Sequence, residues 1–363
     1  MSRADPPRLT TRFTELLGIE HPIVQEGLGP YKTVHLAAAV SNAGGLGTIS
    51  MPGMTAGDQG VRDLRQYIED ACSMTDRPLA VNVPVGTEKG PEGERELPFV
   101  AAYVGAVIDS LADPEIAKRL RVITTSAGPP GVVRQRIADS GLIHMHKVGG
   151  TRQAMRAVSD GADVVIASGY EAGGHTHARP VHTMVLGPNV AEAVDVPVVI
   201  AGGIRDGRGV AAALALGADA VAMGTRFVAS YDNPDWNGAY AEAVLAMREG
   251  EDVVFRAVFG PSRGLQTDGL SELFAILEAG SMSSEELTAW KDDRLIIAQR
   301  DGDTARGIMP CGQVAAGIED LIHVAEFVPG VIAEAIEVLA RVQGLVTPAV
   351  SGRSEPAAGR ADA

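Results

Sequence analysis

Two apolar runs that end in small residues, joined by a helical stretch, constrain the fold of this chain most strongly. They lie in residues 197–227, PVVIAGGIRDGRGVAAALALGADAVAMGTRF. Gly202-Gly203 and Gly224-Thr225 follow the two runs, at points where the backbone could approach a ligand closely and offer free N–H groups. Parallel α/β barrels commonly bind phosphate in the loops after their last two strands. The segment therefore predicts a barrel and a phosphorylated ligand.

The alternation of apolar and amphipathic segments also favours a barrel. Short runs rich in Val and Ile alternate with Ala-rich stretches, a pattern typical of βα units whose strands are buried on both faces. Eight strands are predicted, at 22–25, 47–50, 79–85, 122–126, 142–148, 164–168, 198–201 and 220–223. Helices are predicted at 33–42, 61–73, 99–111, 132–140, 152–160, 185–194 and 207–216. We therefore expect an α/β fold, a TIM (β/α)8 barrel.

The competing fold is a doubly wound open sheet. Its dinucleotide fingerprint, G-x-G-x-x-G directly after the first strand, is absent from the sequence. After about residue 235 the alternation stops, and charged helical patterns follow at 285–290, 314–322 and 331–342. We expect a barrel over 1–235, a C-terminal helical subdomain packed at the barrel mouth over 236–348, and a flexible tail over 349–363. The polar stretch 87–98 is predicted to be a surface insertion.

The charge balance narrows the range of partners. The 363 residues carry a formal net charge of −15, so the overall field repels nucleic acid and anionic membrane surfaces. No uninterrupted apolar run is long enough to span a membrane, and the N-terminal residues lack the apolar core of a signal peptide. We expect a cytoplasmic protein that binds small molecules. Its oligomeric state stays open, and a homodimer is one alternative. Cys72 and Cys311 are predicted to be small buried hydrophobes.

Polar residues at the predicted strand ends are the candidates for chemistry, because these positions face the active site of a barrel. In this sequence they are Gln25, Glu26, Asn82, Lys147, Glu171 and His175. His175 follows two glycines in GYEAGGHTHARP and could serve as a general base near neutral pH. The alternative reading is a solvated loop histidine.

A metal site is the second alternative for these histidines. His175 and His177 form an H-x-H pair, which points both rings to one face of an extended segment, and His182 is near in sequence. No carboxylate or further ligand has matching spacing, so we expect no metal. His144 and His146 form another H-x-H pair within an apolar strand, and we interpret both as structural.

Taken together, the motifs resemble the flavin-dependent nitronate monooxygenases, formerly called 2-nitropropane dioxygenases, with the FMN-dependent enoyl-ACP reductases as near relatives. The resemblance is carried by TRFTELLGIEHPIVQEG, LAAAVSNAGGLGTIS, TDRPLAVNVPV, HMHKV, GYEAGGH, AGGIRDGRGVAAALALGADAVAMGTRF and GIMPCGQVAAGI. It implies noncovalent FMN at the barrel mouth and a catalytic role for His175. The cofactor contacts that it implies are Gln25, Gly27, Asn82, Lys147, Gly174, Gly202, Gly203, Gly224, Thr225 and Gln313.

The chain also departs from the family pattern. Glu26 stands where a glycine is usual, and His177 and Arg179 follow His175 where a glycine is common. A carboxylate at position 26 that points inward would disfavour an anionic nitronate. We expect Glu26, Glu171 and His177 to contact the substrate.

Three functions are compatible with these residues. The first is an FMN-dependent oxidoreductase of the nitronate monooxygenase type, which oxidises a small nitronate, nitroalkane or related acidic carbon compound with O₂. The second is an NAD(P)H-dependent FMN enzyme like the enoyl reductases. The third is a flavin-free barrel lyase or isomerase that acts on a phosphorylated substrate.

Overall fold

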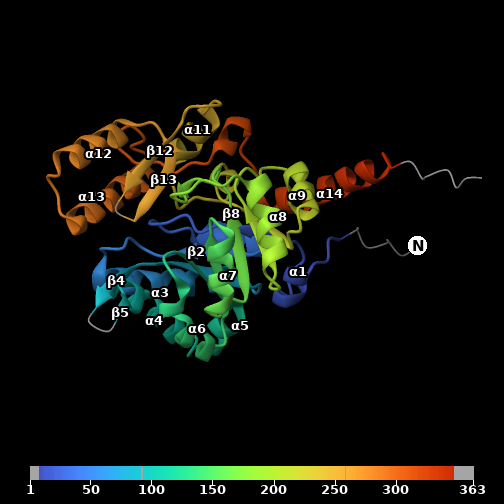
Figure 1. Cartoon of the computed structure of the whole chain (residues 1–363), viewed down its shortest axis with the longest axis horizontal. Helices are drawn as coiled ribbons and strands as arrows, with labels where there is room; N and C mark the ends of the chain where they lie inside the picture. The colour runs from blue at the N-terminus through green and yellow to red at the C-terminus, as the bar shows by residue number, and fades with distance from the viewer. Residues whose placement is uncertain (1–7, 91–92, 258, 347–363) are drawn as a thin grey trace, which may run out of the picture.

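The central element is a closed barrel of eight parallel strands with helices around it (Figure 1). The computed structural model describes residues 8–90, 93–257 and 259–346. In sheet order the strands are β1 (Ile23–Gln25), β11 (Ala220–Met223), β10 (Val198–Ala201), β8 (Val164–Ser168), β7 (Ile143–Val148), β6 (Leu120–Ala127), β3 (Leu79–Val85) and β2 (Gly47–Ser50). Leu46, just before β2, exchanges two backbone hydrogen bonds with β1 and closes the ring. The predicted TIM barrel and its eight strands are confirmed.

Each barrel strand is buried on both faces, as its apolar run predicts. In β10, Val199 and Ala201 belong to the cluster of side chains that fills the barrel interior. Val198 and Ile200, the alternate residues, pack instead against the surrounding helices. Successive side chains of a strand point to opposite faces, so a run without polar residues can supply both layers.

Helices follow the strands on the outside of the barrel. They are α2 (Val34–Asn42), α3 (Gly57–Met74), α4 (Pro98–Ser110), α5 (Pro114–Arg119), α6 (Arg134–Ser140), α7 (Thr151–Ser159), α8 (Thr183–Ala193) and α9 (Gly207–Ala215). The short helix α1 (Arg12–Leu17) places Phe13 and Leu17 in the interior cluster. This helix therefore closes one end of the barrel and leaves the other end for a site.

The segment after β11 differs in part from the expected helical subdomain. It contains α10 (Thr225–Val228), α11 (Gly238–Ala246), β12 (Asp252–Ala257), β13 (Gly260–Leu265), α12 (Asp268–Ala279), α13 (Ser284–Ile296), a π-helical turn (Ile297–Asp301) and a 3₁₀ turn (Gln313–Gly317). Figure 1 shows the yellow-to-orange elements α11, α12, α13, β12 and β13 on one side of the barrel. The segment is thus mostly helical, and the hairpin of β12 and β13 is an addition that the sequence analysis did not predict.

The hairpin follows from its local sequence, and the 3₁₀ turn is held by a side chain from the barrel. Val253, Val254 and Phe255 are β-branched or aromatic and favour a strand, and Gly260 at φ +117° lets the chain turn back. At Gly317 the guanidinium of Arg205 occupies the space where a Cβ would lie, so the backbone there is pinned by a side chain from the barrel. The polar stretch 87–98 also pairs with itself, as strands 87–90 and 93–96.

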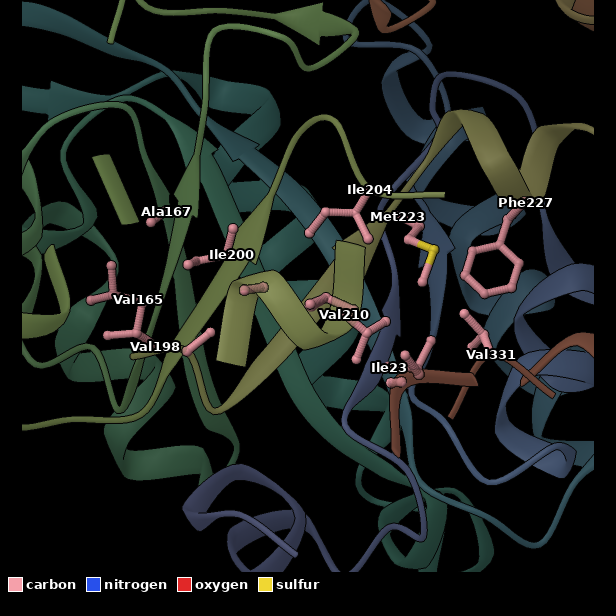
Figure 2. Packing of buried hydrophobic residues seen from close by; sticks show 14 of the residues in the cluster. Ile23, Val165, Ala167, Val198, Ile200, Ile204, Val210, Met223, Phe227 and Val331 are labelled. Atoms are coloured by element: carbon pink, nitrogen blue, oxygen red, sulfur yellow. The ribbon is translucent and has the colours of Figure 1, made fainter. Parts of the chain in front are cut away.

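The last helix, α14 (Val324–Gln343), completes the outer ring of the barrel. It contacts both α9 and α2, rather than the barrel mouth. Its apolar stripe, which includes Val331, lies in one cluster with Ile200 and Val210 (Figure 2). A Cβ at Gly207 would lie 2.5 Å from the backbone nitrogen of Ala335, so the glycine permits this close approach of α9 and α14.

The remaining segment predictions have mixed outcomes. The division of the chain near residue 235 stays a prediction, although α14 belongs with the barrel by its contacts. The predicted tail, 349–363, lies outside the described residues. Among the residues that the structure does describe, no helix is both long enough and apolar enough to cross a bilayer.

The two histidines of β7 are structural, as their apolar surroundings predict. His144 Nε2 and His146 Nδ1 each lie 2.7 Å from Thr125 Oγ1, and both rings are buried. Burial lowers the pKa of His144 to about 4 and the pKa of His146 to about 3. Both imidazoles are therefore neutral in the folded protein at neutral pH.

We predict that His146→Asn weakens the pH dependence of stability. The unfolded chain binds a proton at His146 below about pH 6.5 and the folded chain does not, so wild-type stability falls as the pH drops through this range. Between pH 7 and pH 5 the wild type should lose about 2 kcal/mol that the variant retains. Urea unfolding at both pH values measures the difference. The surface variant His323→Asn is the control, and identical pH dependence in His146→Asn and wild type would refute the prediction.

Candidate active site

A cavity of about 260 Å³ lies at the carboxyl ends of the barrel strands. Residues at or after these ends line its barrel side: Glu26, Met51, Asn82, Lys147, Ser168, Gly202 and Gly224. Residues of the segment after β11 line it from the other side, among them Tyr240, Phe255, Lys291 and Leu295. Most of the polar groups thus come from the strand ends, and much of the apolar wall comes from residues 225–323, the inserted segment between β11 and α14. Such a mixture suits a small organic ligand.

The loops after β10 and β11 present free backbone donors to this cavity. Gly202 and Gly203 have φ of +97° and +80°, a conformation that favours glycine. Within the described ranges, no protein acceptor is found for the N–H groups of Gly203 and Gly224. Thr225 Oγ1 accepts a hydrogen bond of 3.0 Å from the backbone N–H of Gly312, which ties a third loop to the same corner. This arrangement can bind a phosphate group.

His175 is positioned by the inserted segment. The short strand β9 (Gly174–His175) pairs with β13, with His175 opposite Ser262 and Gly174 opposite Arg263. Arg263 is buried, forms an ion pair with Asp252 and donates two hydrogen bonds, of 2.9 and 3.1 Å, to the carbonyl of Tyr170. These contacts hold the loop that carries His175 over the cavity, at Tyr170 and at Gly174-His175.

The charge state of His175 follows from its surroundings. Its ring lines the cavity, and its Nε2 atom is buried with no hydrogen-bond partner in the part of the chain that the structure describes. Burial lowers the pKa of His175 to about 3, and the ammonium groups of Lys291 and Lys147 act in the same direction. The imidazole is therefore neutral at neutral pH.

Lys147 and Glu26 meet across the cavity. Lys147 Nζ lies 3.1 Å from Glu26 Oε2, and both side chains are largely buried. Beside them, a Cβ at Gly27 would lie 2.6 Å from the side chain of Asn82, so only glycine allows this approach. Asn82 in turn donates a hydrogen bond of 3.1 Å to Thr124 Oγ1. The structure thus brings these four predicted site residues together.

Two predicted cofactor contacts do not line the cavity. Gln25 is fully buried within the barrel, where its Oε1 accepts a hydrogen bond of 2.9 Å from Thr48 N and its Nε2 donates to the carbonyl of Glu26. Gln313 is exposed, and its side-chain nitrogen lies 3.4 Å from the carboxylate of Asp252. Its backbone N–H donates to the carbonyl of Glu171, so the residue supports the loop instead.

Glu171 and His177, the two other predicted substrate contacts, line the cavity, but each also contacts nearby protein groups. The carboxylate of Glu171 accepts hydrogen bonds from Thr183 N and Thr183 Oγ1, at the start of α8. His177 Nδ1 lies 3.2 Å from the backbone of Arg179. A Cβ at Gly149 would lie 2.6 Å from His177 Cβ, so this loop packs tightly on the barrel. Across the residues described, no group of three or more His, Cys, Asp or Glu could hold a metal ion.

Lys291 and Asp292 are site residues that the sequence analysis missed. Both lie on α13, line the cavity and are about 5% exposed. Burial lowers the pKa of Lys291 and raises that of Asp292. The stretch SEELTAWKDDR suggests a charged solvent-facing helix, which hides them. The usable signal was spacing, because Leu287, Lys291 and Leu295 recur every four residues and so share the buried face.

Comparison with known proteins identifies the family of this chain. The nitronate monooxygenase family model matches residues 10–334. A Rhodococcus jostii protein named (3aS,4S,5R,7aS)-5-hydroxy-7a-methyl-1-oxo-octahydro-1H-indene-4-carboxyl-CoA dehydrogenase is 32% identical over 91% of this chain and 96% of its own length. A probable nitronate monooxygenase of Staphylococcus saprophyticus is 33% identical over 73% of this chain and 81% of its own length.

A solved structure extends the likeness to three dimensions. FabK from Thermotoga maritima superposes with a TM-score of 0.80, at 34% identity, over 93% of this chain and 99% of that chain. The family match covers the barrel, the cavity and the inserted segment together. With its strand-end cavity, its two glycine loops and the histidine that lines the cavity, this chain belongs to the nitronate monooxygenase family of oxidoreductases.

Proposed function

We propose that this chain is an FMN-dependent oxidoreductase of the nitronate monooxygenase type, which oxidises a small nitroalkane, nitronate or related acidic carbon compound with O₂. The observation that carries the proposal is the shared cavity of the glycine loops and His175. The glycine loops after β10 and β11 offer backbone N–H donors for a phosphate. The loop that carries His175 offers a neutral imidazole at another part of the cavity wall. A flavin mononucleotide has a phosphate at one end and a reactive ring at the other.

The residues present fit FMN. The N–H groups of Gly203 and Gly224 need acceptors, and Gly312 belongs to a loop bonded to the same corner. A phosphate would supply those acceptors. Lys147 and Asn82 line the opposite side of the cavity, where the ring would lie, and Gly174 lies beside His175. Gln25 and Gln313 would act indirectly, by holding the backbone of these loops.

The chemistry divides between cofactor and chain. Bound FMN would accept two electrons from the carbon substrate and return them to O₂. His175 would accept the carbon-bound proton, since its imidazole is unprotonated at neutral pH. Lys147 would place a cation, balanced by Glu26, beside the reacting groups. The apolar residues of the inserted segment would exclude water from them.

We predict that Gly203→Val lowers FMN affinity by at least tenfold, because a side chain there strains the left-handed backbone and intrudes on the phosphate corner. Titration of the protein with FMN, followed by quenching of flavin fluorescence, measures the affinity. Gly141→Val is a matched control, since Gly141 also has a positive φ, of +77°, but ends α6 away from the cavity. Equal FMN affinity in Gly203→Val and wild type would move the phosphate site elsewhere.

We predict that His175→Asn keeps the bound flavin but loses turnover of neutral nitroethane by about a hundredfold. Ethyl nitronate, which has already lost its proton, should be affected far less. Oxygen consumption with each substrate gives the ratio, and the exposed His35→Asn serves as control. An equal loss on both substrates would assign His175 to binding instead of proton transfer.

A second candidate is an FMN enzyme that exchanges electrons with NAD(P)H and an acyl thioester. It is favoured by the Rhodococcus relative, whose name specifies dehydrogenation of a CoA ester, and by the apolar wall that Phe255, Leu295 and Ile308 form. For the first function we expect the flavin absorbance to persist after anaerobic addition of NADH or NADPH. Rapid bleaching by either nucleotide would favour the second.

A further inference from the structure

The ion pair of Glu26 and Lys147 sets the charge that the cavity offers to a substrate. Glu26 follows β1 and Lys147 lies on β7, so the pair joins strands that are far apart in the sheet order. Their side chains are 12% and 21% exposed. Glu26 Oε1 is buried, and no hydrogen-bond partner for it exists among the described residues. One carboxylate oxygen thus neutralises the lysine, and the other is left without a donor.

The other charged groups around the cavity do not offset this carboxylate. The lining contains two lysines and three carboxylates, namely Lys147, Lys291, Glu26, Glu171 and Asp292. His175 is neutral, and Glu171 is held by Thr183. Burial disfavours the charged forms of both Lys291 and Asp292, which are neighbours on α13. The formal charge of the lining is therefore −1, from two positive and three negative groups.

An anion that enters such a cavity gives up its hydration, and the charge of Lys147 is already neutralised by Glu26. The loss of hydration is costly unless a cation replaces the water. An uncharged molecule does not bear this cost, and its nitro or carbonyl oxygen can still accept a hydrogen bond from the lysine. The bound phosphate of FMN would add further negative charge to the same space.

We propose that Glu26 is a specificity-determining residue, which makes this site select the uncharged form of a carbon acid over its conjugate anion. This inference rests on the proposed function and narrows its substrate class to neutral nitro or carbonyl compounds that still carry the acidic hydrogen. Their proton has to be removed within the cavity, and His175 is the neutral base that lines it.

Binding of two unreactive probes to the FMN-loaded protein tests the proposal. Nitrate is a planar anion that resembles a nitronate group, and 2-methyl-2-nitropropane is an uncharged nitro compound with no hydrogen on the carbon that bears the nitro group. Isothermal calorimetry gives both dissociation constants without turnover. For Glu26→Gln we expect nitrate affinity to rise at least about tenfold, while affinity for the neutral probe changes less than about twofold.

Three further variants make the outcome specific. Glu26→Asp retains the charge and should bind nitrate as the wild type does. In Glu26→Gln/Lys147→Met the gain should vanish, because the cation released by the first change is absent. Glu20→Gln is the matched control, since its carboxylate also pairs at 3.1 Å with a cation, Arg77, but at the protein surface.

Unchanged nitrate affinity in Glu26→Gln, or an equal gain for both probes, would overturn the inference. These results are distinguishable from failure of the proposed function. A protein that binds FMN but oxidises no nitroalkane or nitronate would refute that function, whereas the ratio of nitrate affinities in the FMN-loaded protein still reports on Glu26.

Discussion

The backbone pairing of Gly174 and His175 with β13 is the contact on which the site depends. It is a short antiparallel ladder between a barrel loop and the inserted segment. Without it, His175 would belong to a polar loop open to solvent, and a solvated imidazole would titrate near its ordinary pKa. With it, the ring is held against the cavity wall with its Nε2 atom buried, where its charged form is disfavoured. The inserted segment therefore contributes the electrostatic environment of the histidine as well as a wall of the cavity.

The two ends of the cavity use opposite ways of handling charge. At the glycine corner, backbone N–H groups offer fixed partial positive charges that need no counterion. Near the strand ends of β1 and β7, a full positive charge is present but matched by a carboxylate. The first arrangement suits a permanently charged phosphate, and the second suits groups that change charge only during reaction. This division is what separates cofactor binding from substrate selection in the proposed function.

Much of the barrel could be predicted because its signals are local. Strands buried on both faces produce apolar runs such as Val198–Ala201 whatever lies beside them, and the order of these runs then specifies where their carboxyl ends meet. Glycines at 202, 203 and 224 mark the phosphate corner for the same local reason. The position of Asn82 and Lys147 at one cavity follows from the barrel geometry, whereas that of His175 also depends on the pairing with β13.

The parts that could not be predicted depend on contacts between distant segments. The direction of the Gln313 side chain is decided by Asp252, and that of Glu171 by Thr183. Lys291 is buried because α13 packs over the barrel mouth, a fact that its charged neighbours in sequence conceal. The ion pair of Glu26 with Lys147 likewise depends on the orientation of the two side chains inside the barrel mouth, which the sequence does not specify.

The position of α14 has a consequence for how the chain reaches this structure. The helix packs between α9 and α2 and buries Val331 beside Ile200, yet the whole inserted segment separates it from β11. During synthesis, the apolar faces of α9 and α2 that α14 covers stay exposed until α14 emerges from the ribosome. Closing such a long loop carries an entropic cost and slows folding of contact-rich, non-local topologies. The segment that builds the active-site wall is therefore synthesised before the helix that completes the outer ring of the barrel.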